Sequence, residues 1–139
     1  MPCLSGQFDP TVGVLLQIGI LPPGTTPAVA AGGATLTQFP ALLDTGASDT
    51  CIAPVIARAL ALPPIGMRPM RSAHRTTPVN VYQADVVIMF GNQGFVLSNH
   101  QVVEFVVPPS SPFQVLLGRD IICRGMLSMS SDGHFAFAL

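Results

Sequence analysis

Short apolar runs, rich in β-branched residues and separated by turns containing Pro or Gly, are the feature that most limits how this chain can fold. The run from Thr11 to Leu21 ends at Pro22-Pro23-Gly24, and another run leads from Leu36 to Leu43. Such runs favour strands, while Pro and Gly end them. We therefore predict strands over residues 11–21, 36–43, 50–56, 79–90, 95–97, 101–107, 114–117 and 134–139.

Helix signals are scarce. Gly118 opens and Gly125 closes a helical pattern over residues 119–124, which predicts one short C-terminal helix. Residues 58–62 are expected to form a single helical turn before Pro63-Pro64. Because domains typically run about 100–200 residues, the 139 residues are expected to form a single, mostly β domain spanning 1–139.

A long hairpin is predicted in the middle of the chain. Two extended runs lie between Met67 and Phe90, and they are joined around Ser72 to Pro78. The second run contains many Val and Ile residues, which are typical of strands.

The chain is unusually apolar, with 49% hydrophobic and only 9% charged residues, against a globular average of about 25% charged. A membrane-spanning helix needs about 20 consecutive apolar residues, and the stretch from Val12 to Leu21 is too short. No Lys or Arg precedes Arg58, so a secretory signal is not expected. We expect a soluble, cytoplasmic protein with no membrane partner, whose excess apolar surface is covered by a second copy or forms a substrate groove.

The charge pattern argues against nucleic acid binding. The formal net charge is −1, the chain has no Lys, and its basic residues cluster only loosely at Arg68, Arg71 and Arg75. Phosphate neutralisation needs a more concentrated basic patch.

No metal or cofactor is expected. The three cysteines, Cys3, Cys51 and Cys123, are scattered and lack the paired spacing of zinc sites. Their odd number fits reduced thiols in a reducing compartment. His100 and His134 are isolated, and no Ser or Cys is visibly paired with a His for nucleophilic catalysis.

The candidate catalytic residue is Asp44, which begins Asp44-Thr45-Gly46 directly after an apolar strand. A loop at a strand end is a common position for functional groups. Alone, such a tripeptide also makes ordinary turns. The chain contains one copy of it and no internal repeat that would supply a second.

Two segments together carry a resemblance to a known family. Residues 41–48 (Ala-Leu-Leu-Asp-Thr-Gly-Ala-Ser) and 115–120 (Val-Leu-Leu-Gly-Arg-Asp) resemble the two signatures of retroviral-type aspartic proteases, or retropepsins, and their bacterial relatives. The resemblance covers the chain from about Val12 to its end. It implies an all-β fold: a closed retropepsin-like β-barrel with a flap hairpin and one short C-terminal helix.

The resemblance also implies a homodimeric aspartic endopeptidase. Two carboxylates about 3 Å apart share one proton, so that one serves as base and the other as acid. By resemblance, Asp44 of each subunit supplies one of them. Thr45 is expected to reach into the partner's backbone, and Gly46 to allow close backbone approach. The terminal strand 134–139 is expected to pair with its counterpart or with an N-terminal strand.

Support for the catalytic loop is implied for the second signature. Leu116, Leu117 and Gly118 are expected to pass beneath the loop. Arg119 resembles the family arginine that pairs with an acidic residue soon after Asp-Thr-Gly, and the candidate partner is Asp49, because Ser48 stands where many viral enzymes have an Asp.

The implied substrate is an extended peptide or unfolded protein with apolar residues at the cut. Matching the family pattern places Leu42, Cys51 and Leu116 along the pockets and Gln114 near their rim, with Ser48 and Asp49 also beside the substrate. A buried core thiol is an equally good interpretation of Cys51. The flap tip contains His74, Arg75 and Thr76 where the family usually has Gly. That departure leaves open a catalytically inactive dimerisation or peptide-binding module. An unrelated small β-barrel would require both signatures to be accidental.

Overall fold

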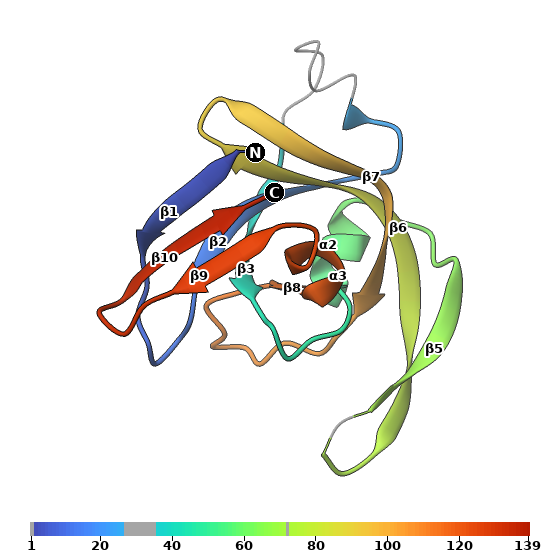
Figure 1. Cartoon of the computed structure of the whole chain (residues 1–139). Helices are drawn as coiled ribbons and strands as arrows, with labels where there is room; N and C mark the ends of the chain where they lie inside the picture. The colour runs from blue at the N-terminus through green and yellow to red at the C-terminus, as the bar shows by residue number, and fades with distance from the viewer. Residues whose placement is uncertain (1, 27–35, 72) are drawn as a thin grey trace.

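The chain forms a β-barrel with a smaller sheet packed against it, as shown by a computed structural model that describes residues 2–26, 36–71 and 73–139 (Figure 1). The elements in chain order are β1 (Cys3–Gln7), β2 (Leu15–Leu21), β3 (Gln38–Leu43), β4 (Cys51–Ile52), α2 (Pro54–Ala59), β5 (Gly66–Arg71), β6 (Thr76–Phe90), β7 (Gln93–Glu104), β8 (Val115–Leu117), α3 (Arg119–Ile122), β9 (Met126–Met129) and β10 (His134–Ala138).

The barrel closes through pairing of its first and last strands. The strand order is β2-β3-β8-β4-β7-β6, and β6 returns to pair with β2 with Ile18 opposite Ile88. Closure leaves these six strands without an open edge, and β5 continues the sheet beyond β6 as an extra strand. The prediction of a closed, mostly β barrel is confirmed.

The core lies inside the barrel because the apolar side chains on its inner face are excluded from water. Ile18, Ile20, Ile88 and Val102 are at most 1% exposed and come from β2, β6 and β7. Side chains in a strand alternate between the two faces, so each of these strands contributes several residues to the same interior. α3 adds Ile121, which is fully buried.

A three-stranded sheet, β1-β10-β9, covers part of the barrel (Figure 1). Phe137 of β10 is fully buried, and its ring centroid lies 6.4 Å from that of Phe90 at the end of β6. The aromatic pair joins the small sheet to the barrel in one hydrophobic core.

The β5–β6 hairpin extends away from the barrel (Figure 1). Gly66 to Arg71 pair with Val81 to Thr76, so the predicted hairpin is present. Farther along β6, a register shift at Asp85 marks an irregularity in the β6–β7 pairing. The buried Asp85 carboxylate accepts hydrogen bonds from the backbone N–H groups of Gly24 and Asn99 and from the Thr26 hydroxyl, which compensates the cost of burying a charge.

Several predicted elements are wrong in detail. The strands expected over 95–97 and 101–107 are one strand that ends at Glu104. Residues 11–13 are a turn instead of strand, because the Asp9 carboxylate accepts hydrogen bonds from the N–H and hydroxyl of Thr11. The strand expected over 50–56 ends after Ile52, and the helix begins at Pro54 instead of Arg58. Pro is well suited to a first helical position, where its missing N–H has no partner to lose.

The terminal strand also pairs differently from the expectation of a contact between subunits. β10 lies between β1 and β9 of its own chain, with Cys3 opposite Ala138 and Phe137 opposite Leu127. Both of its edges are therefore occupied within one chain, and no edge is left for the β10 strand of another copy. The pairing with an N-terminal strand is intramolecular.

Replacing Phe137 by Ala is expected to lower the free energy of unfolding by about 3–5 kcal/mol, because it leaves a cavity where the sheet meets the barrel. The matched control is Met126→Ala on β9, where the side chain is 68% exposed and the change should stay within about 0.5 kcal/mol. Urea unfolding at a fixed protein concentration measures both. Equal losses for the two variants would contradict the proposed packing.

Candidate active site

Asp44 lies just beyond the end of β3, on a loop held by the neighbouring strand. β3 and β8 are parallel, with Leu43 opposite Leu117, and the Asp44 N–H donates to the Leu117 carbonyl at 2.9 Å. The N–H of Leu43 donates to the Val14 carbonyl at 3.0 Å. The half-buried Asp44 is thus fixed by backbone hydrogen bonds on both sides of β3.

The loop folds back on the Asp44 side chain. The Gly46 N–H donates to Asp44 Oδ1 at 2.8 Å, and the Ala47 N–H donates to the Asp44 carbonyl at 3.1 Å. A Cβ at Gly46 would lie 3.1 Å from Asp44 Oδ1, tighter than an ordinary contact. Glycine therefore lets the backbone approach the carboxylate, while Thr45 and Gly46 remain exposed.

Arg119 supports the loop in a way that the sequence did not predict. Its guanidinium donates to the Thr45 carbonyl at 2.7 Å, and its backbone N–H donates to the Ala47 carbonyl at 2.9 Å. The expected pairing of Arg119 with Asp49 is wrong. The Asp49 carboxylate instead faces β5, where it forms an ion pair with Arg68 and accepts a hydrogen bond from Ser48 Oγ.

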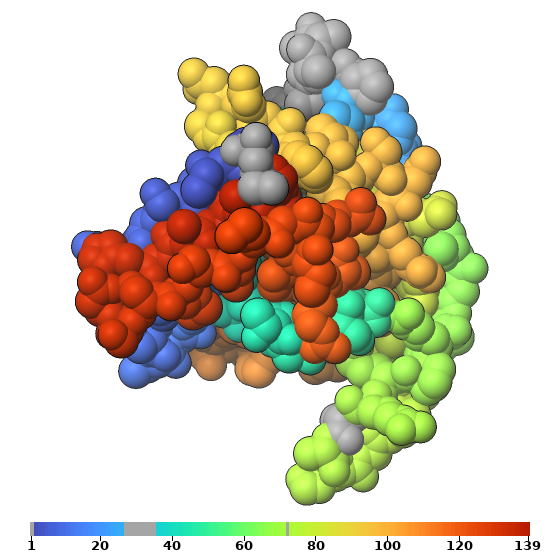
Figure 2. All heavy atoms as spheres, in the orientation of Figure 1, coloured from blue at the N-terminus to red at the C-terminus, as the bar shows by residue number. Residues whose placement is uncertain are grey.

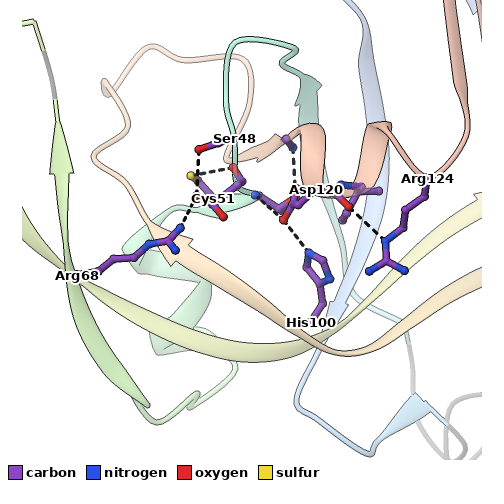
Figure 3. A network of polar contacts seen from close by, with 10 residues as sticks. Ser48, Cys51, Arg68, His100, Asp120 and Arg124 are labelled. Atoms are coloured by element: carbon purple, nitrogen blue, oxygen red, sulfur yellow. Dashed lines mark hydrogen bonds and ion pairs between the residues drawn. The ribbon is translucent and has the colours of Figure 1, made fainter.

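A second carboxylate, Asp120, lies behind the loop at the centre of a polar network (Figure 3). It accepts hydrogen bonds from the Thr50 N–H at 3.0 Å and the Thr50 hydroxyl at 2.8 Å, and its Oδ2 lies 2.8 Å from His100 Nε2. Thr50 Oγ1 in turn accepts from the Gly118 N–H at 3.2 Å. The network joins the start of β4, the start of α3 and the middle of β7.

This network is not apparent from the sequence. Asp120 is the end of the second signature, whereas Thr50 and His100 belong to neither signature. The sole sequence signal is the position of Asp120 directly after Gly118-Arg119, because its partners lie 70 and 20 residues away.

The network lowers the pKa of Asp120. Burial of the carboxyl raises its pKa, but the hydrogen bonds from His100 and Thr50 outweigh that effect, so the pKa lies below its ordinary value. Asp120 is therefore a stably ionised group that supports the loop.

A cleft of about 850 Å³ opens beside the Asp44 loop. Its apolar lining includes Met70 and Val79 from the hairpin and Val103, Phe105 and Leu116 from the barrel and the segment after β7. In the space-filling view the hairpin projects beyond the body of the molecule (Figure 2). The cleft therefore lies between a protruding hairpin and the barrel wall.

The predicted site residues divide between this lining and other positions. Gly46, Ser48, Asp49, Cys51, Arg75 and Leu116 line the cleft. The residues not among the lining are Asp44 and Thr45, which lie beside the cleft, together with Leu42, His74, Thr76 and Gln114. Gln114 takes part in backbone pairing, donating to Pro40 and accepting from Ala53, whereas His74 and Thr76 are exposed near the hairpin tip.

Cys51 faces the cleft as a protonated thiol. Burial, with the negative charges of Asp49 and Asp120, raises its pKa to about 12, and its Sγ lies 3.4 Å from the Asp49 carbonyl. A thiol with so high a pKa is a poor nucleophile near neutral pH, so Cys51 contributes to the wall of the cleft. Among the described residues, no three His, Cys, Asp or Glu side chains are grouped so that they could hold a metal ion.

Comparison with known proteins identifies the family. A family model described as aspartyl protease matches residues 26–121, which contain the Asp44 loop, the hairpin and β8. The chain belongs to the aspartyl protease family. No curated protein matches this aspartyl protease-family chain.

One solved structure places the fold of this family member among retropepsin-like proteins. A retropepsin-like aspartic protease from Rickettsia conorii matches with a TM-score of 0.62 and 15% identity, covering 97% of this chain and 89% of its own. The retroviral protease-like domain of Ddi1 from Leishmania major matches with a TM-score of 0.42 and 12% identity, covering 86% and 83%. In the part of the chain that the structure describes, no helix is long and apolar enough to cross a membrane.

Asp120→Asn is expected to lower stability at neutral pH by about 2 kcal/mol, because it removes the charge from several hydrogen bonds. The lowered pKa of Asp120 contributes stability that is present above its unfolded value and is lost as pH falls through the folded value. The variant should therefore lose less stability than the wild type between about pH 5 and pH 2.

Urea unfolding across this pH range tests the prediction. Asp85, whose pKa is also lowered because backbone and Thr26 hydrogen bonds outweigh its burial, still titrates in the variant and serves as the internal reference. Identical pH slopes for the wild type and the Asp120→Asn variant would contradict the role given to Asp120.

Proposed function

We propose that this chain is an aspartic endopeptidase that acts as a homodimer, in which the Asp44 carboxylates of two copies activate a water molecule between them. The observation that carries the proposal is the position of Asp44. It is a half-buried carboxylate on a loop supported by Leu117 and Arg119, inside the region that matches the aspartyl protease family.

The proposed chemistry needs two carboxylates that share one proton. The ionised carboxylate takes a proton from the water that attacks the peptide carbonyl, while the protonated one donates to the carbonyl oxygen. The proton then passes to the departing amine. The pKa values belong to the pair of carboxylates, so either copy of Asp44 can serve as the acid while the other serves as the base.

Neither neighbouring carboxylate of the same chain is suited to be the second one. Asp49 is engaged by Arg68, and Asp120 is engaged by Thr50 and His100 behind the loop. A second copy of Asp44 across a two-fold axis supplies the missing group without any new sequence. This supports a homodimer as the active form.

The proposed dimer contact is formed around the Asp44 loop. Thr45 and Gly46 are exposed, and the carbonyl of Thr45 is held by Arg119. The Thr45 hydroxyl would be available to the partner's loop. Because both edges of β10 are occupied within the chain, this contact would not depend on pairing between terminal strands.

The proposed substrate is an extended peptide or unfolded protein with apolar side chains at the cut. The apolar lining of the cleft, including Cys51, Phe105 and Leu116, supports this preference. The β5–β6 hairpin would act as the flap that covers the bound peptide. We also propose a cytoplasmic location, with which three free cysteines are consistent, and a reaction that needs only the carboxylates and water.

Asp44→Asn is expected to reduce cleavage of a denatured protein or peptide library by at least about a hundredfold, because it removes the proton transfers of the pair. Asp132→Asn, in the exposed turn before β10, is the matched control and should retain activity. Circular dichroism and sedimentation of both variants test whether fold and association are unchanged. Full activity of the purified Asp44→Asn variant would sink the assignment.

Activity per chain is expected to fall on dilution through the dimer dissociation constant, because each copy provides one Asp44. A dilution series of cleavage rates, measured beside sedimentation at the same concentrations, tests this. A monomer that remains fully active would refute an active site formed by two chains.

A further inference from the structure

The arginines of this chain are concentrated on the hairpin beside the cleft. Three of the six arginines, Arg68, Arg71 and Arg75, lie on the β5–β6 hairpin, and residues 66–79 include no Asp or Glu. All three line the cleft. In a chain with only 9% charged residues, half of the positive charge therefore faces one groove.

The cleft is positive although the protein as a whole is slightly negative. Asp49 is the only acidic residue in the lining, so three arginines against one aspartate leave a formal charge of +2. The whole chain carries −1, so the remainder carries −3. Counting Asp44 as fully ionised still leaves the cleft and catalytic loop at +1. Charge of one sign in a cleft with apolar walls attracts ligands of the opposite sign.

The three arginines differ in what they contact. Arg68 is held by Asp49 across the cleft. Arg71, at the end of β5 and opposite Thr76, is exposed and forms no ion pair with any described residue. Arg75 lies on the other side of the hairpin tip, just before β6. The guanidinium of Arg71 is thus positioned at the cleft and available to a ligand.

We propose that the cleft selects peptides with a Glu or Asp close to the apolar residues at the cut, and that Arg71 and Arg75 determine this specificity. The inference rests on the proposed function, since it defines the substrate of the same site. A guanidinium binds a carboxylate through two parallel hydrogen bonds, and the apolar walls formed by Val79, Val103 and Phe105 would accept the apolar residues at the cut. In a homodimer the two-fold axis places one arginine set on each side of the cut, so acidic residues are favoured on either side.

The test compares the binding of two fluorescent peptides to the Asp44→Asn variant, which prevents turnover. Both have the same central apolar pair, one with Glu and the other with Gln two or three positions away on each side. The Glu peptide should bind about three- to tenfold more tightly at low salt. The difference should largely disappear at about 0.5 M salt, because screening weakens exposed charge pairs.

Variants of the arginines identify the residues responsible. Arg71→Gln combined with Arg75→Gln should abolish the preference for the Glu peptide, so that the Glu and Gln peptides bind with the same Kd. Arg58→Gln is the matched control, because Arg58 is an exposed arginine on α2 and does not line the cleft. Charge reversal to Arg71→Glu with Arg75→Glu should shift the preference to a Lys peptide.

Several outcomes would overturn the proposal. They are equal binding of the Glu and Gln peptides, a preference that persists in the double Gln variant, and competition by a single-stranded oligonucleotide as strong as that by the Glu peptide. Binding is measured without catalysis, so the two proposals are tested separately. Failure of the wild type to cleave any library peptide would count against the proposed function. The comparison of Glu and Gln peptide binding would still decide the specificity proposal.

Discussion

The geometry of the site depends on the hydrogen bonds that the Asp120 carboxylate accepts from Thr50. The carboxylate holds Thr50 through the backbone N–H and the hydroxyl, and Thr50 in turn accepts a hydrogen bond from the Gly118 N–H. Gly118 directly precedes Arg119, whose backbone and side chain hold the carbonyls of Ala47 and Thr45. A continuous chain of contacts therefore runs from one ionised carboxylate to the loop that presents another.

Position 118 has no room for any side chain, because Gly118 packs closely against the backbone of Asp49. A Cβ at Gly118 would lie 2.5 Å from the backbone carbon of Asp49, closer than real Cβ contacts. The two segments meet backbone to backbone, so small changes in one would be transmitted to the other. Among the described residues, no buried side-chain polar atom lacks a hydrogen-bond partner, so this dense packing is achieved without isolated polar groups.

The sequence predicts best what is encoded by neighbouring residues. Apolar residues before Asp44 and the Leu116-Leu117-Gly118 run locate β3, β8 and the loop, because each is a local pattern. The predicted partner of Arg119 is wrong because Asp49 pairs with Arg68 instead, and the sequence alone does not show that β5 brings Arg68 to Asp49. His100 and Thr50 could not be linked to Asp120 for the same reason: their contacts depend on how distant strands are placed. The start of the helix is encoded locally by Pro54, but the apolar residues of 50–56 predict a strand over the same segment.

The terminal sheet bears on how folding and the proposed assembly are related. β10 is the central strand between β1 and β9, and its Phe135 and Phe137 side chains are buried against the core of the same chain. Each copy thus completes its own barrel and its own covering sheet before any partner is present. A proposed second copy would add a carboxylate and a second cleft wall, but no strand that the fold lacks. Folding and formation of the two-chain site are then separable steps, and an inactive but folded single chain is a physically reasonable state of this protein.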